Sequence, residues 1–242
     1  RDQAGVEALT PPDPDKLAPE VIDALQQARA QIPEETALLG FCGAPWTLAA
    51  YLVQGRGVKD FPALRAFAAA QPEALNALLA KLSDAMATYL INQARAGADA
   101  VQVFDSWAGI LSLRDWERLI RPHLETMLEK VGEADVPRIL FLQNAPHLME
   151  AYASLPAEVL SVDWRVDIAD VQARHTNHAV QGNIDPAILL HGAALTEAAA
   201  ADLLRRVDPQ GHIVNLGHGI LPGTPLESVE ALVGVVHNEK LQ

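Results

Sequence analysis

The sequence predicts a parallel α/β fold, either an open sheet or a closed (β/α)₈ barrel. Stretches with helical patterns alternate with short segments that are almost continuously apolar, and such segments are typical of strands covered on both faces, as in parallel sheets. A strand–helix alternation repeated this often favours a parallel sheet over other α/β arrangements. The expected strands cover residues 37–43, 100–106, 138–144, 159–165, 178–184 and 212–218.

The expected helices have recognisable starts and ends. One helix is expected over about residues 19–31, ahead of the first strand. The Ala- and Leu-rich stretch 72–95 stops before Gly97, which suits a left-handed C-terminal cap. Ser112 can cap the next helix, and Pro122 should kink or break it.

Two further helix starts are predicted in the C-terminal half. Asp185 offers an N-cap followed by Pro186 at the first helical position. Residues 224–227, Thr-Pro-Leu-Glu, have the pattern of a capping box with proline again at the first position. The last helix then carries an apolar face, formed by Leu226, Val229, Leu232, Val233 and Val236.

Composition limits the classes of protein and of partner. The 242 residues contain 18 Lys and Arg against 31 Asp and Glu, a net charge of −13, which repels nucleic acid and anionic membranes. We find no apolar run near the ~20 residues that cross a bilayer and no signal-peptide core. One cysteine allows neither an internal disulfide nor a Cys-rich zinc site. We expect a single cytoplasmic domain over residues 1–242, with no nucleic-acid or membrane partner.

Ligands of parallel α/β proteins bind at the carboxyl ends of the strands, so the residues there are the candidates for a site. His218 lies between two glycines, which let the backbone turn sharply and expose the imidazole. Asp185 is better explained as a helix cap, and Cys42 as a small buried apolar residue. The strand ends also supply Cys42, Trp46, Asp105, Ser106, Trp107, Asn144, Asp163, Trp164, Asn183 and Asn215.

Common cofactor motifs do not explain these strand ends. The Gly217-x-Gly219 pattern lacks the third glycine and the later acidic residue of a dinucleotide-binding fingerprint. We find no phosphate-binding glycine–lysine loop. Ser106 has no base beside it in sequence, which argues against a serine nucleophile. We expect no cofactor and no metal.

Five ordered blocks resemble the uroporphyrinogen decarboxylase family of haem biosynthesis. They are GFCGAPWTLAAYLVQG (40–55), GADAVQVFDSWAGILS (97–112), LSVDWRVDIADVQ (160–172), VQGNIDPAILL (180–190) and NLGHGILPGTPLESVEALVGVVH (215–237). Their order and spacing over nearly the whole chain are far more specific than any single motif. The resemblance implies a (β/α)₈ barrel of the TIM type, usually a homodimer.

The resemblance also implies an activity. Members of the family are lyases that decarboxylate the four acetate side chains of uroporphyrinogen III, giving coproporphyrinogen III without cofactor or metal. Three positions match substrate-contacting residues of the family. Tyr51 and Ser106 would offer hydroxyl groups to propionate or acetate, and His218 would pair with a carboxylate or carry a proton.

The sequence enters the family pattern about a third of the way along. The arginine-rich N-terminal block has no counterpart, nor has the second-strand aspartate that accepts hydrogen bonds from the pyrrole N–H groups, so the catalytic residue stays unassigned. We therefore expect about six of the eight barrel strands, with two unpaired sheet edges, and interpret the sequence as a piece of a full decarboxylase.

Two alternatives to an active decarboxylase stay open. The chain alone could be a catalytically incomplete fragment that binds porphyrinogen or dimerises. A cobalamin-linked methyltransferase of the same superfamily would, by resemblance, bind zinc through His and Cys ligands, and a single cysteine argues against that set.

Overall fold

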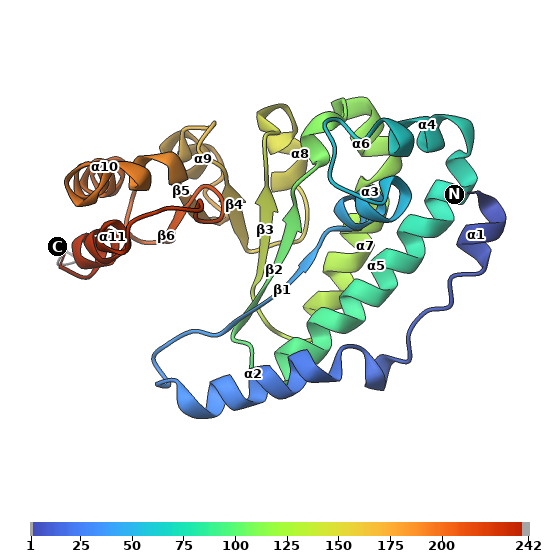
Figure 1. The fold of residues 1–242 in the computed structure, drawn as a ribbon, viewed down its shortest axis with the longest axis horizontal. Helices are drawn as coiled ribbons and strands as arrows, with labels where there is room; N and C mark the ends of the chain where they lie inside the picture. The colour runs from blue at the N-terminus through green and yellow to red at the C-terminus, as the bar shows by residue number, and fades with distance from the viewer. Residues whose placement is uncertain (1, 239–242) are drawn as a thin grey trace.

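The chain forms one parallel sheet of six strands, and their order in the sheet is their order in the sequence (Figure 1). This computed structural model describes residues 2–238. All six predicted strands are confirmed, with bounds shifted by at most three residues. They are β1 (Leu39–Gly43), β2 (Ala100–Asp105), β3 (Arg138–Leu142), β4 (Val159–Val162), β5 (Ala179–Ile184) and β6 (His212–Leu216).

The sheet has the topology of six consecutive units of a (β/α) barrel, with β1 and β6 as its edges. The register is regular, and Gly43 pairs with Phe104, which pairs with Phe141. Further along the sheet Ser161 pairs with Gln181, which pairs with Ile213. The predicted fold class is therefore confirmed, as a sheet that is not closed within the described residues.

Helices connect successive strands. The α-helices are α1 (Gln3–Glu7), α2 (Pro19–Gln31), α3 (Pro45–Gln54), α4 (Pro62–Ala70), α5 (Pro72–Arg95), α6 (Leu113–Leu119), α7 (Arg121–Gly132), α8 (Met149–Ala153), α9 (Ile168–Arg174), α10 (Ala193–Arg206) and α11 (Leu226–Asn238). Short 3₁₀ turns are η1 (Pro14–Lys16), η2 (Ala108–Ile110), η3 (Pro146–Leu148) and η4 (Pro186–His191).

Local sequence signals account for most helix boundaries. Gly97 follows α5 with φ +110°, the conformation expected at a glycine cap. The Ser112 hydroxyl accepts a hydrogen bond from the Asp115 N–H at 3.1 Å and so caps α6. The predicted break falls at Ile120, so that Pro122 lies in the first turn of α7.

Of the two helix starts predicted in the C-terminal half, one is confirmed and the other is wrong. The Asp185 side chain accepts from the Ala187 N–H at 2.9 Å, as predicted, although the element that it caps is the 3₁₀ turn η4. The capping-box prediction is wrong. The helix α11 begins at Leu226, and the Thr224 hydroxyl donates to the Leu221 carbonyl at 2.8 Å instead of accepting from the helix.

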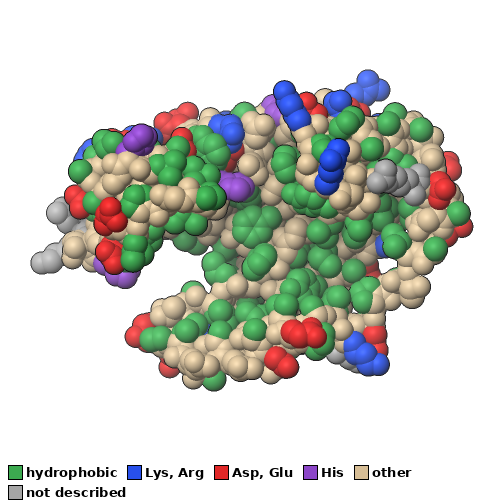
Figure 2. Space-filling model, viewed as in Figure 1, with side chains coloured by type: hydrophobic (Ala, Val, Ile, Leu, Met, Phe, Trp, Pro, Cys, Tyr) green, Lys and Arg blue, Asp and Glu red, His purple; other side chains and the backbone are tan. Residues whose placement is uncertain are grey.

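The two faces of the sheet differ in what covers them. Residues that alternate along a strand point to opposite faces, and on β1 Cys42 is buried whereas Phe41 is 61% exposed. The buried face is packed by the helices, with side chains such as Trp46, Leu90 and Leu124 fully enclosed. Figure 2 shows the other, inner face as an indentation between the C-terminal helices and the α2 segment, with hydrophobic side chains gathered on its walls.

The edge strand β1 is protected by a side chain. Gln93 of α5 is 2% exposed, and its carboxamide accepts a hydrogen bond from the Phe41 N–H at 2.9 Å and donates one to the Phe41 carbonyl at 3.0 Å. Gly40 makes room for this amide, because a Cβ there would lie 2.9 Å from the Gln93 Oε1. One side chain thus satisfies the backbone groups that a neighbouring strand would otherwise satisfy.

Candidate functional site

The carboxyl ends of β1 and β2 are joined by the first turn of α3. The Thr47 hydroxyl donates to the Asp105 carboxylate at 3.1 Å and accepts from the Ser106 N–H at 3.0 Å. The Trp46 indole N–H donates to the Trp107 carbonyl at 3.1 Å. The turn that follows β2 is therefore attached to α3 at consecutive residues.

The same turn carries an aromatic contact with the next turn of α3. The Trp107 indole N–H donates to the Tyr51 hydroxyl at 3.1 Å, and the two rings are 6.4 Å apart, edge to face. Phe61, which is fully buried, packs under both rings, 5.9 Å from Tyr51 and 4.7 Å from Trp107. Tyr51 is 44% exposed, so its ring edge remains open to a ligand. We call Thr47, Tyr51, Asp105, Ser106 and Trp107 the α3–β2 cluster.

Asp105 is the ionisable group at the base of this cluster. It has no exposed surface, and it accepts hydrogen bonds from the Thr47 and Tyr152 hydroxyl groups. Burial raises the pKa of Asp105 to about 6, although these hydrogen bonds stabilise the carboxylate and oppose the shift. Burial and the neighbouring carboxylate also raise the pKa of Tyr152 well above its ordinary value.

A hollow of about 360 Å³ lies on the inner face of the sheet, toward β6. Its walls are amide and hydroxyl groups, aromatic rings and an imidazole. The Gln181 side chain is 1% exposed and donates to the Ser161 hydroxyl at 2.9 Å, while its Oε1 has no hydrogen-bond partner. The lining residues are Gln102, Phe104, Phe141, Ser161, Gln181, Asn215, Leu216, His218 and Gly219.

A row of rings crosses the inner face from β1 to the loop after β6. The ring of Phe41 is 5.8 Å from that of Phe104, which is 5.5 Å from Phe141, and Phe141 is 6.3 Å from the His218 imidazole. Aromatic pairs at these separations attract each other and present both faces and edges to a ligand. These rings are steeply inclined to one another, so the row places apolar ring edges beside the polar groups of the hollow.

The structure brings together two of the three residues expected to contact substrate. Tyr51 and Ser106 both belong to the α3–β2 cluster, through Trp107 and Thr47 respectively. His218 is exposed and lies beyond β6, on the wall of the hollow. Cys42 is buried, as predicted, and burial raises the pKa of its thiol.

Four residues that line the hollow were not predicted from the sequence. Gln102 and Phe104 alternate along β2 and point into the hollow, as do Ser161 and Gln181 on later strands. A period of two in these segments is the signal that could have identified them. A strand taken as one continuous apolar run carries no information about the face on which its polar residues lie.

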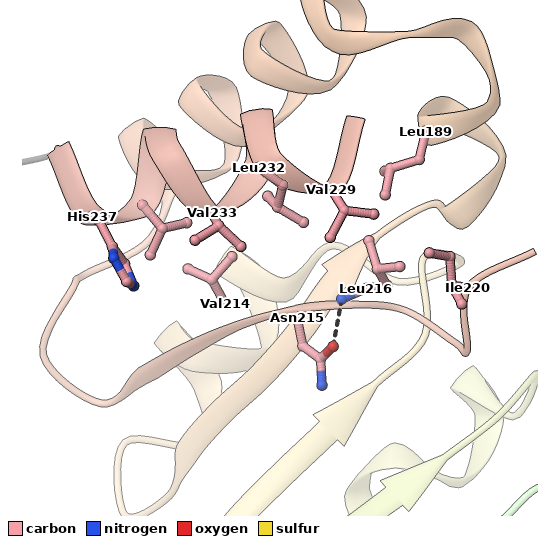
Figure 3. Close-up of a pocket in the computed structure, with 10 residues that line it drawn as sticks. Leu189, Val214, Asn215, Leu216, Ile220, Val229, Leu232, Val233 and His237 are labelled. Carbon is pink, nitrogen blue, oxygen red and sulfur yellow. Dashed lines mark hydrogen bonds between the residues drawn. The ribbon is translucent and has the colours of Figure 1, made fainter. Parts of the chain in front are cut away.

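A second hollow, of about 310 Å³, lies on the other side of β6, against α11 (Figure 3). Val214 and Leu216 point toward the helix and meet Val229 and Leu232, whereas Asn215 points away and accepts from the Leu216 N–H at 2.8 Å. Most of this lining is aliphatic, so the hollow belongs to the packing of α11. The predicted apolar face of this helix is confirmed there, except that Leu226 is 69% exposed.

Arg165 is a cation at the end of β4. Its guanidinium binds the Asp163 carboxylate at 2.6 Å and lies 4.1 Å over the Trp164 ring. Asp163 is 2% exposed and also accepts from the Asn144 N–H at 2.7 Å, which ties the ends of β3 and β4 together. Arg174 is not at a strand end: it lies in α9 and pairs with Glu150 of α8 at 2.9 Å.

Residues 2–238 contain neither a metal-binding cluster nor a membrane-spanning helix. In this range no group of three or more His, Cys, Asp or Glu side chains is arranged to hold a metal ion. Nor does any helix within it have the length and apolarity needed to cross a bilayer.

The parallel sheet in sequence order, with its polar and aromatic residues at the carboxyl ends of the strands, defines a protein of the (β/α) barrel class. The sequence model of the family described as uroporphyrinogen decarboxylase (URO-D) matches residues 1–239. The chain belongs to this family.

Curated relatives agree with this assignment. The chain is 39% identical over 233 residues to uroporphyrinogen decarboxylase of Trichodesmium erythraeum and 41% identical over 234 residues to that of Synechococcus sp. strain CC9605. The alignments cover 95% and 96% of this chain but 66% of each relative, so the chain spans about two thirds of their length.

Among solved structures, a methyltransferase from Methanosarcina mazei has a similar fold. It superimposes with a TM-score of 0.83 over 95% of this chain and 68% of that structure. The sequence identity is 22%, so this likeness shows the fold alone.

Proposed function

We propose that the protein of which this chain is part decarboxylates the four acetate side chains of uroporphyrinogen III, giving coproporphyrinogen III, without cofactor or metal. The observation that carries the proposal is the family match over residues 1–239 together with relatives near 40% identity that bear this name. We further propose that it acts in the cytoplasm as a homodimer.

The proposed chemistry uses the pyrrole ring as its own electron sink. A proton adds to the ring carbon next to the acetate-bearing carbon and produces an iminium-like cation. The bond between the methylene and the carboxylate then breaks, CO₂ leaves, and its electron pair neutralises the cation. A proton adds to the former methylene carbon, the ring loses its extra proton, and a methyl group remains. The protein must bind, orient and deliver protons, and it must stabilise a transient positive charge.

The described residues suit parts of this task. The aromatic row from Phe41 to Phe141 suits the apolar faces of the individual pyrrole rings. Tyr51 and Ser106, in the α3–β2 cluster, offer hydroxyl groups for the carboxylates of the tetrapyrrole, and His218 offers an imidazole on the wall of the hollow. We leave the proton donor unassigned, because no described residue matches the family's aspartate.

Anaerobic turnover of uroporphyrinogen by the purified chain tests the proposal, with the products separated by carboxyl count. Porphyrinogens with seven to four carboxylates support it. A chain that binds coproporphyrin tightly but gives no product, beside an active longer relative as control, is instead an incomplete porphyrinogen-binding fragment.

Variants of the three site residues sharpen the assay. Tyr51→Phe, Ser106→Ala and His218→Gln should each lower kcat/KM, whereas His191→Gln, at an exposed position at the end of η4, is the matched control for the histidine. Equal activity of His218→Gln and His191→Gln would refute the role of His218.

A further inference from the structure

Thr47 and Asp105 lie beneath the turn after β2, on the helix-covered side, and neither is expected to contact substrate. Thr47 is 6% exposed and Asp105 has no exposed surface. Both belong to the helix-covered side of the sheet, and neither is among the residues that line the inner hollow. Because they are buried there, their effect on a ligand would have to pass through the turn.

The Thr47 hydroxyl has one direction in this arrangement. An ionised carboxylate can only accept hydrogen bonds, so the Thr47 proton must point to Asp105 and its lone pair must face the Ser106 N–H. Tyr152 donates a second hydrogen bond to Asp105. The Ser106 N–H is therefore held by Thr47, whose own orientation is set by the buried carboxylate.

This turn also fixes the aromatic contact with α3. The Trp107 carbonyl accepts a hydrogen bond from the Trp46 indole N–H, and the Trp107 indole N–H donates to the Tyr51 hydroxyl at 3.1 Å. Ser106 and Tyr51 are 55 positions apart in sequence, yet a single network orients both.

We infer that Thr47 and Asp105 are positioning residues, which hold Ser106 and Tyr51 at the separation that two carboxylates of one substrate require. The inference rests on the proposed function, since it assigns a purpose to the geometry of the same site. A positioning role explains why buried polar groups lie beneath the Ser106 and Tyr51 hydroxyls. An apolar contact would bury the turn but would not orient it.

The test compares Thr47→Val, which keeps the shape and removes the hydroxyl, with Thr47→Ser, which keeps the hydroxyl. Thr196→Val on α10 is the matched control, because Thr196 is also fully buried and its hydroxyl donates only to the Gly192 carbonyl of its own helix at 3.0 Å. All variants are made in the full chain with ¹⁵N-labelled tryptophan.

The first readout is the indole N–H resonances, which do not depend on activity. In Thr47→Val we expect the Trp107 resonance to shift and to exchange faster with solvent by about tenfold, while that of Trp164, at the end of β4, stays in place. Thr47→Ser should restore the wild-type spectrum. Asp105→Asn is the second variant, and it should move the Trp107 resonance in the same direction.

The second readout is turnover of uroporphyrinogen. We expect Thr47→Val to raise KM about tenfold with kcat changed less than about threefold, and Thr47→Ser to behave as wild type. An unshifted Trp107 resonance in Thr47→Val, or equal kinetic losses in Thr47→Val and Thr196→Val, would overturn the inference. Absence of turnover by the wild-type chain, beside an active longer relative, would make the chain an incomplete fragment, and the indole readout would then decide the positioning role alone.

Discussion

Replacing Asp105 with asparagine removes a carboxylate that the fold buries completely among neutral donors. Burial raises the pKa of Asp105 from the ordinary 3.8 to about 6. This shift of about two pKa units corresponds to about 3 kcal/mol, because one unit is worth about 1.4 kcal/mol. Compared with the unfolded chain, the folded protein therefore favours the protonated acid, and ionisation of Asp105 lowers the free energy of unfolding.

The sign and the pH window follow from the two pKa values. The contribution of Asp105 to the free energy of unfolding is fully present below its pKa in the unfolded chain, about 3.9, and is lost as the pH rises through its pKa in the folded protein. Between about pH 4.5 and about pH 7.5 we expect the wild-type free energy of unfolding to fall by about 2 kcal/mol relative to that of Asp105→Asn.

Urea unfolding followed by tryptophan fluorescence at several pH values measures this difference. Burial lowers the pKa of His123, His178 and His212, which gives the opposite pH trend, but both proteins share these histidines and the comparison removes them. Tyr152→Phe removes a donor to the carboxylate, so its stability should fall more steeply with pH than that of the wild type. Parallel profiles for wild type and Asp105→Asn would refute the reasoning.

Other predictions concern the sheet edge, a close approach of two loops and the thiol. Gln93→Leu should lower the free energy of unfolding by about 2 kcal/mol and promote association through β1, as seen by sedimentation, because it leaves two backbone groups unsatisfied. Gly109→Ala should destabilise by about 1–3 kcal/mol, because its Cβ would lie 2.2 Å from a carbonyl oxygen in the loop after β3. The control Gly234→Ala, with open space around it in α11, should be neutral or slightly stabilising in the same urea assay. Cys42 should react with a thiol reagent only after unfolding, and rapid modification of the native protein would contradict its burial.

The strands and several helix ends were predictable because their signals are local. Gly97 and Ser112 act within a few residues of the boundary that they define, and apolar runs mark strands wherever both faces are covered. Thr224 shows the limit of such signals. Its hydroxyl could serve a helix or the preceding turn, and the turn at Leu221 is what it binds.

The site was predictable only in part. Ser106 and His218 were already candidates at the strand ends, whereas Tyr51 came from the family resemblance, and the structure shows that Tyr51 and Ser106 share one network. The contact between Thr47 and Asp105 joins residues 58 positions apart and leaves no periodic trace in the sequence. Such a contact depends on how β1 and β2 are paired, which no local pattern encodes.

The order of the strands also bears on how the chain folds. Each strand from β2 to β6 hydrogen-bonds to the strand that precedes it in sequence, so its partner has already been synthesised when it leaves the ribosome. Paired residues are 61 positions apart between β1 and β2 but 20 apart between β3 and β4, so the entropic cost of loop closure is greatest for the first pair. The strands described here can therefore be added one at a time in the direction of translation, and Gln93 closes the free edge of β1 once α5 has formed.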